Sequence, residues 1–114
     1  VEAFFKSLEK SKQKKIVIIS STVGSNIEMQ APIFSYASSK AATNKVFTLL
    51  SNVLKDKGYN IYIFCPGNVK TRMGGQNASV NVKESVEGMI SLILNLKSYQ
   101  TGNFLRYNGE KVQF

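Results

Sequence analysis

The sequence contains no histidine, only one cysteine, and no apolar run as long as eighteen residues. Without histidine, the chain lacks the side chain that most often moves protons in enzymes. The single cysteine, Cys65, cannot form an internal disulfide, and it lies in an apolar run. We therefore expect a small buried side chain and a reducing, cytoplasmic setting. A membrane-spanning stretch and a signal-peptide pattern are also missing, so no membrane partner is expected, and no metal site is predicted.

The charge of the chain is strongly basic, with 15 Lys and Arg against 7 Asp and Glu and a net charge of +8. A basic nucleic-acid-binding module is therefore one possible function. However, only Arg72 and Arg106 are arginines, and readout of base edges favours the bidentate guanidinium group. Five of the lysines lie within residues 6–15, a run typical of a solvated helix end. We therefore predict no nucleic-acid partner.

The order of predicted elements points to an α/β fold. The length of 114 residues allows one small domain at most. Continuous apolar runs at 15–20 and 60–65 are typical of strands buried on both faces, and a last strand is expected at 102–109. Helical patterns precede and separate these strands. Such alternation predicts a parallel sheet, here one half of a doubly wound, Rossmann-type sheet with helices on both faces.

Three helices are expected. The first covers residues 3–11, the second runs over 35–57 with Gly58 as its C-terminal cap, and the third begins at Asn81. Glu84 lies at the capping-box distance from Asn81. The apolar repeat of the second helix consists of Ala42, Val46, Leu49 or Leu50, and Val53. The expected inner face of the third helix consists of Val82, Val86, Met89, Ile90 and Ile93.

A serine, a tyrosine and a lysine suggest how proton transfer could proceed without histidine. Tyr36 and Lys40 are four residues apart at the start of the second helix, so they share one helix face. A free phenol has a pKa near 10, and a neighbouring ammonium group favours the phenolate. Ser21 follows the first strand and could hydrogen-bond a carbonyl oxygen beside the phenol. Each residue alone is unremarkable, and only the joint pattern indicates catalysis.

The segment from Pro66 to Thr71 follows the second strand. Ligands of parallel α/β sheets bind outside the carboxyl ends of the strands. Ser21, the start of the second helix and this segment can therefore converge at one edge of the sheet. The paired glycines Gly74-Gly75 do not lie between a strand and a helix, so they are not a dinucleotide-binding fingerprint.

The segments "IVIISSTVGS", "YASSKAATN" and "CPGNVKT" resemble the short-chain dehydrogenases/reductases. The segments "PGNVKTRMGG" and "TGNFLRYNGEKVQF" are similar to the carbonyl-reductase branch that includes sniffer and the C-factor protein. The resemblance implies that Tyr36 is the general acid of carbonyl reduction. It implies that Lys40 assists this tyrosine and binds the nicotinamide ribose, and that Ser21 orients the carbonyl. The implied cofactor-binding residues are Tyr36, Lys40, Pro66, Gly67, Val69 and Thr71.

The resemblance also implies what the whole enzyme would do. Residues 1–114 would be the C-terminal portion of one NAD(P)-binding domain whose N-terminal half, with the glycine-rich cofactor turn, is absent. The cofactor would be NADP or NAD, with NADP typical of this branch, and the substrate would be a small carbonyl compound. A homo-oligomer, a dimer or tetramer, is expected for the whole protein, and the 114 residues alone are expected to be inactive. The alternative is a non-catalytic sensor or interaction protein with the same fold.

Overall fold

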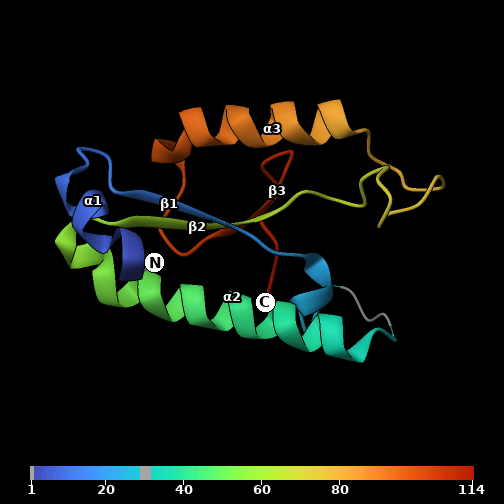
Figure 1. Ribbon diagram of the computed structural model, residues 1–114, viewed down its shortest axis with the longest axis horizontal. Coiled ribbons are helices and arrows are strands. Elements are labelled where there is room, and N and C mark those ends of the chain that lie inside the picture. Colours follow the sequence, from blue (N-terminus) through green and yellow to red (C-terminus); the bar gives the residue numbers. More distant parts are fainter. Residues whose placement is uncertain (1, 29–31) are drawn as a thin grey trace.

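The chain forms a three-stranded parallel sheet with α3 over one face and α2 over the other (Figure 1). The structure is a computed structural model, and it describes residues 2–28 and 32–114. The elements follow in the order α1 (Phe5–Lys10), β1 (Lys15–Ile19), α2 (Phe34–Leu54), β2 (Asn60–Cys65), α3 (Val82–Leu94) and β3 (Phe104–Arg106). This order confirms the predicted alternation of helices and strands. Residues 29–31, between the first strand and the second helix in the sequence, lie outside the described residues.

The strands place their carboxyl ends at one edge of the sheet. β1 pairs with β2 so that Ile19 lies opposite Phe64, and β2 pairs with β3 so that Cys65 lies opposite Arg106. All three strands run in the same direction, so the segments that follow Ile19 and Cys65 leave the sheet side by side. This is the edge at which α/β folds bind ligands.

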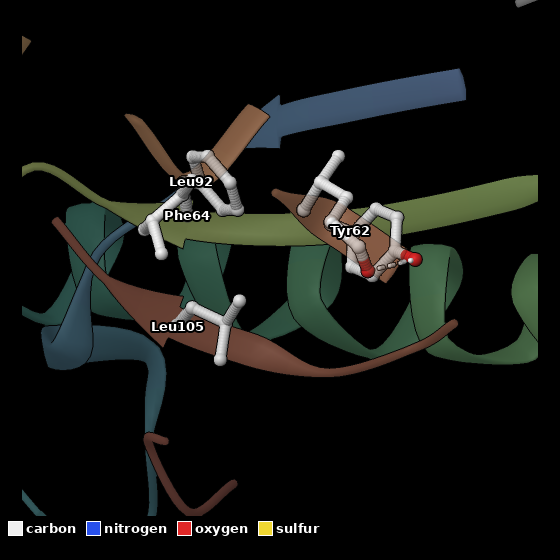
Figure 2. Close-up of a cluster of buried hydrophobic side chains, with 5 residues drawn as sticks. Tyr62, Phe64, Leu92 and Leu105 are labelled. Carbon is white, nitrogen blue, oxygen red and sulfur yellow. Dashed lines mark hydrogen bonds between the residues drawn. The ribbon is translucent and has the colours of Figure 1, made fainter. Parts of the chain in front are cut away.

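The central strand β2 is buried on both faces, as predicted, and its side chains alternate between two cores. Tyr62 and Phe64 point toward α3, where they pack with Leu92, Leu96 and Leu105 (Figure 2). Phe64 is fully buried. Burial of such a side chain contributes about 1.5–3 kcal/mol to folding. This core holds α3 against the sheet.

The other side chains of β2 form the core beneath α2. Ile63 and Cys65 pack with Phe104 and Val112, and Phe47 of α2 contacts this group. Ile61 packs further along the strand in a cluster that also contacts Phe47. Cys65 is 3% exposed and unpaired, which confirms the expected small buried side chain.

The prediction that β1 is buried on both faces is wrong. Its first four residues are half-buried, and Ile19 is 50% exposed. Within residues 2–28 and 32–114, β2 is the only strand that pairs with β1, so β1 forms an edge of the sheet. An apolar run shows that a strand can be buried. Whether it is buried depends on the elements that pack against it, which its own sequence does not determine.

The predicted inner face of α3 is wrong at every residue except Met89. The residues that α3 turns to the protein are Ser85, Met89 and Leu92, at spacings of four and three. Most of the expected inner residues are 37–51% exposed, namely Val82, Val86, Ile90 and Ile93. The helix is apolar on more than one face, so periodicity alone does not choose the buried face.

The ends of α3 and β3 differ in detail from the prediction. Asn81 is the N-cap residue of α3 but makes no side-chain capping hydrogen bond. Glu84 instead accepts a hydrogen bond from the hydroxyl group of Tyr107 at 2.8 Å, so the predicted capping box is wrong. β3 is limited to three residues because the chain turns at Gly109, which has a φ of 90°. Only residues 104–106 of the strand predicted at 102–109 therefore form β3.

Above pH 10 the protein is expected to lose stability in part through Tyr62. Burial raises the pKa of the Tyr62 phenol above its ordinary value of 10.0. Its contribution to stability is therefore complete below that pH and is lost as the pH rises through the folded-state pKa. The free energy of unfolding, measured by urea titration, should fall above pH 10. Replacement Tyr62→Phe should make this fall shallower, and equal slopes for both proteins would contradict the assignment.

Candidate active site

Two serines follow β1 and have different surroundings. The backbone N–H of Ser20 donates to the carbonyl oxygen of Phe64 at 2.7 Å, so Ser20 continues the sheet. Its hydroxyl group is buried and donates to Oδ1 of Asn44 at 2.5 Å. Ser21 caps a short 3-10 turn, Thr22–Gly24, and its hydroxyl oxygen accepts from the N–H of Val23 at 3.3 Å. The two residues therefore divide as predicted, with Ser20 part of the sheet and Ser21 beyond it.

Tyr36 and Lys40 lie on the first turns of α2 and face the end of β1. The Nζ atom of Lys40 is 5.7 Å from the centre of the Tyr36 ring. The same ammonium group donates to the carbonyl oxygen of Ile19 at 3.3 Å, which ties the helix to the last residue of β1. Tyr36 is 38% exposed and lines the hollow described below, so it is accessible to a ligand. The predicted sharing of one helix face is confirmed.

Gly24 sets how closely the Ser21 turn approaches α2. A Cβ atom at Gly24 would lie 2.5 Å from the carbonyl carbon of Lys40 and 2.6 Å from the nitrogen of Ala41. Both atoms belong to the helix backbone, which cannot move aside at low cost. The absence of a side chain at residue 24 therefore allows Ser21 to lie beside the turn of α2 that carries Tyr36 and Lys40.

The segment after β2 is fixed from two sides. The Ser85 hydroxyl group of α3 donates to the carbonyl oxygen of Pro66 at 2.6 Å. Val69 forms a β-bridge with Val80. The N–H of Lys70 donates to the carbonyl oxygen of Val80, and the N–H of Val80 donates to that of Asn68, both at 2.9 Å. Thr71 closes the segment, where its hydroxyl oxygen accepts from the N–H of Gly74 at 3.1 Å.

Gly67 needs to be glycine for two reasons. Its φ of 84° lies in the left-handed region that side chains disfavour. A Cβ atom there would also come within 3.1 Å of both Tyr107 and Val80. The backbone at this point can therefore turn away from β2 and run along the edge of the sheet.

These segments enclose a hollow of about 580 Å³ at the carboxyl edge of the sheet. Six of the residues predicted for the site line it: Ser21, Tyr36, Pro66, Gly67, Val69 and Thr71. Lys40, the seventh, does not line the hollow but lies behind Tyr36. The predicted convergence of these residues is confirmed, while their catalytic and cofactor-binding roles stay predictions.

The walls of the hollow are uncharged. None of the described residues that line it is Lys, Arg, Asp or Glu. Apolar side chains of Ile33, Met73, Val86 and Met89 contribute to the walls. Arg72 is exposed and lies outside the lining. A site of this composition suits a ligand that is neutral and largely apolar.

Sequence reasoning missed two residues that support the site. Asn44 is 2% exposed and accepts a hydrogen bond from Ser20, and Ser85 donates one to the carbonyl oxygen of Pro66. The sequence did offer a sign of Asn44 and Ser85, because each is a polar residue within a predicted helix. Their partners lie 24 and 19 residues away, so their hydrogen bonds could not be read from local pattern.

The described part of the chain shows neither a cluster of metal-binding residues nor a helix that could span a membrane. Within residues 2–28 and 32–114, no group of three or more His, Cys, Asp or Glu side chains could hold a metal ion. None of the helices over the same residues has the length and apolar character needed to cross a lipid bilayer.

Comparison with known proteins gives a consistent result. The family model for short chain dehydrogenase matches residues 1–81. Among curated proteins, an uncharacterized oxidoreductase of Schizosaccharomyces pombe is 31% identical over 99% of this chain and 52% of its own length. The C-signal protein of Myxococcus xanthus is 30% identical over 96% of this chain and 67% of its own length.

Solved structures show the same likeness. NADPH-bound carbonyl reductase from chicken fatty liver is 33% identical, with a TM-score of 0.87 over 99% of this chain and 50% of that protein. The carbonyl reductase Sniffer of Drosophila melanogaster is 31% identical, with a TM-score of 0.82 over 88% of this chain and 41% of that protein. The chain thus spans about half the length of several relatives that it matches. The chain belongs to the short-chain dehydrogenase family, and within that family it is similar to the branch that contains sniffer.

Proposed function

We propose that these residues form the catalytic half of an oxidoreductase that reduces a neutral carbonyl compound with a nicotinamide cofactor. The observation that carries the proposal is the position of Ser21 and Tyr36 on one uncharged hollow, with Lys40 directly behind the tyrosine. The family of the chain and its likeness to carbonyl reductases support the same reaction.

The residues that are present fit the nicotinamide end of such a cofactor. Thr71 and residues 66–69 line the hollow, and Lys40 has an ammonium group directly behind Tyr36. Hydroxyl, amide and ammonium groups are suitable partners for a carboxamide and ribose hydroxyls. A solved relative contains NADPH, which favours NADPH over NADH for this chain. When bound, the cofactor supplies the hydride that reduces the carbonyl carbon.

The chain itself would supply the proton and the orientation. The Ser21 hydroxyl group would donate a hydrogen bond to the carbonyl oxygen and hold it beside the phenol of Tyr36. As charge develops on that oxygen, Tyr36 would transfer its hydroxyl proton to it, which completes the alcohol. Lys40, held by the Ile19 carbonyl group, would stabilise the phenolate that remains.

The test is cofactor-dependent turnover in a full-length protein, in which we expect these residues to be joined to a dinucleotide-binding half; relatives are about twice as long as this chain. NADPH oxidation should depend on an added aldehyde, ketone or quinone, and the alcohol or hydroquinone should accumulate in equal amount. NADPH binding without turnover of any carbonyl compound would favour the alternative, a non-catalytic sensor of the same fold. The 114 residues alone should not turn over substrate, and the cytoplasm remains the proposed location.

We also propose that the whole protein is a homo-oligomer and that the outer face of α2 contributes to the contact. Val46, Leu49 and Val53 lie along this face and are 57%, 51% and 69% exposed. Replacement of Val46 and Val53 by lysine should shift the protein toward monomer in sedimentation velocity. Leu94→Lys on α3, where the leucine is 74% exposed, is the control and should leave the mass unchanged. Equal sedimentation of both variants and the unaltered protein would contradict the assignment.

A further inference from the structure

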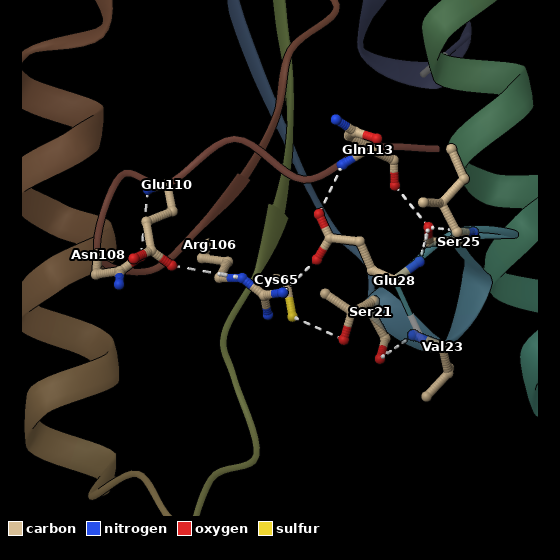
Figure 3. Close-up of polar contacts among 11 residues, drawn as sticks. Ser21, Val23, Ser25, Glu28, Cys65, Arg106, Asn108, Glu110 and Gln113 are labelled. Carbon is tan, nitrogen blue, oxygen red and sulfur yellow. Dashed lines mark hydrogen bonds and ion pairs between the residues drawn. The ribbon is translucent and has the colours of Figure 1, made fainter. Parts of the chain in front are cut away.

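We propose that Glu28 is a positioning residue, which fastens one wall of the carbonyl-binding hollow to the C-terminal segment. The inference rests on the proposed function for its catalytic consequence. Its structural basis is a set of polar contacts between residues 25–28 and residues 106–113 (Figure 3). These contacts lie outside the catalytic residues and have no part in the proton transfer described above.

The Glu28 carboxylate has two partners from distant parts of the chain. Its Oε2 atom forms an ion pair with Nη2 of Arg106, at the end of β3. Its Oε1 atom accepts from the backbone N–H of Gln113 at 2.9 Å. The Glu28 side chain is only 20% exposed, so the pair is partly shielded from water. Shielding makes such a charged hydrogen bond stronger than one on an open surface.

Ser25 binds the other backbone polar group of Gln113. Its hydroxyl group donates to the carbonyl oxygen of Gln113 at 2.6 Å. The Ser25 oxygen also accepts from the N–H groups of Ile27 and Glu28, at 3.1 and 3.0 Å. Both backbone polar groups of Gln113 are therefore held by this loop. Two hydrogen bonds and an ion pair together fix residues 25–28 against the C-terminal segment.

Residues that line the hollow flank the fastened loop on both sides in the sequence. Ser21, Thr22 and Val23 line the hollow just before it, and Ile33 and Tyr36 line it just after. Only residues 29–35 separate Glu28 from Tyr36. Release of Glu28 should therefore loosen both walls, while Lys40 and the segment after β2 keep their own contacts.

Arg106 provides a matched control for this proposal. Its Nε atom also lies 3.6 Å from Oε2 of Glu110, a side chain that is 67% exposed. Replacements Glu28→Ala and Glu110→Ala thus remove one carboxylate each from the same arginine and change the net charge equally. Only the first releases the loop.

The first measurement is amide hydrogen exchange by NMR, which does not depend on activity. The exchange rates of two amides measure how often the walls of the hollow open. The N–H of Gly24 donates to the Ser21 carbonyl oxygen, and the N–H of Ala37 donates to the Ile33 carbonyl oxygen. In Glu28→Ala, exchange at Gly24, Ala37 and Gln113 should accelerate by about tenfold, which corresponds to loss of one charge-assisted hydrogen bond. In Glu110→Ala it should stay within about twofold of the unaltered protein. Equal exchange in the two variants would overturn the proposal.

The second measurement is the KM for a carbonyl substrate and for NADPH in the full-length protein. For a bulky aromatic aldehyde, Glu28→Ala should raise KM by about tenfold, because the walls that contact it are loosened. The KM for NADPH should stay within about twofold, because the segment after β2 keeps its own contacts. Faster exchange with an unchanged aromatic-aldehyde KM would overturn the positioning role. If the unaltered protein reduces no carbonyl, the proposed function fails, and the exchange at Gly24 and Ala37 alone decides whether Glu28 fixes the walls.

Discussion

Replacement Tyr36→Phe is expected to lower kcat by about 10²–10⁴-fold, because the phenylalanine ring keeps the shape of the side chain but has no proton to give. Tyr36 lines the hollow with Ser21 and is 38% exposed, so it is accessible to a carbonyl compound. Affinity for NADPH should change only a few fold, since the phenol is one of several proposed contacts. The comparison is made by steady-state kinetics on the full-length protein, with cofactor binding measured separately by fluorescence.

Tyr99→Phe is the matched control for this experiment. Tyr99 packs against the core beneath α3, away from the hollow, so the same loss of a hydroxyl group should leave kcat within about twofold. If Tyr36→Phe retains more than about a tenth of the original kcat, general acid catalysis by this residue is wrong.

Lys40→Met should impair both the rate and the binding of the cofactor. The ammonium group lies behind the Tyr36 ring and is held by the Ile19 carbonyl oxygen, so its position is well defined. Loss of the cation removes its stabilisation of the phenolate and its proposed contact with the ribose. We expect kcat to fall by about 10²-fold and the KM for NADPH to rise by about tenfold.

Lys45→Met removes the same charge from an exposed position on the same helix. This control separates the local role of Lys40 from the effect of the net charge of the protein on an anionic cofactor. Equal effects of the two replacements, or an unchanged KM for NADPH in Lys40→Met, would show that the lysine has no specific part in the site.

The sequence was sufficient to predict the elements whose burial is decided by their own residues. β2 begins and ends at the predicted residues, because an unbroken apolar run in a central strand is covered on both faces. β1 carries a similar run but has Ile19 half exposed, since its coverage depends on neighbours along the sheet. In α3, Ser85 and Leu92 face inward where Val86 and Ile90 were expected, because apolar residues lie around most of the helix.

The candidate site shows the same division. Ser21 and Tyr36 could be placed together from their positions at the end of a strand and the start of a helix, and the hollow contains both. The contacts that hold them could not be predicted in this way. The bond from Ser20 to Asn44 and the ion pair of Glu28 with Arg106 join residues that are 24 and 78 positions apart. Long-range polar pairs of this kind depend on the final packing of the elements.

Transfer of deuterium from the cofactor to the carbonyl carbon tests the central claim most directly. The full-length protein would be supplied with NADPH deuterated at both C4 positions and with an aromatic aldehyde, and the product would be examined by mass spectrometry. The account predicts an alcohol with deuterium on its carbinol carbon, formed by the unaltered protein at a rate at least about 10²-fold above that of Tyr36→Phe. An alcohol without deuterium, or no alcohol from a protein that binds both compounds, would contradict it.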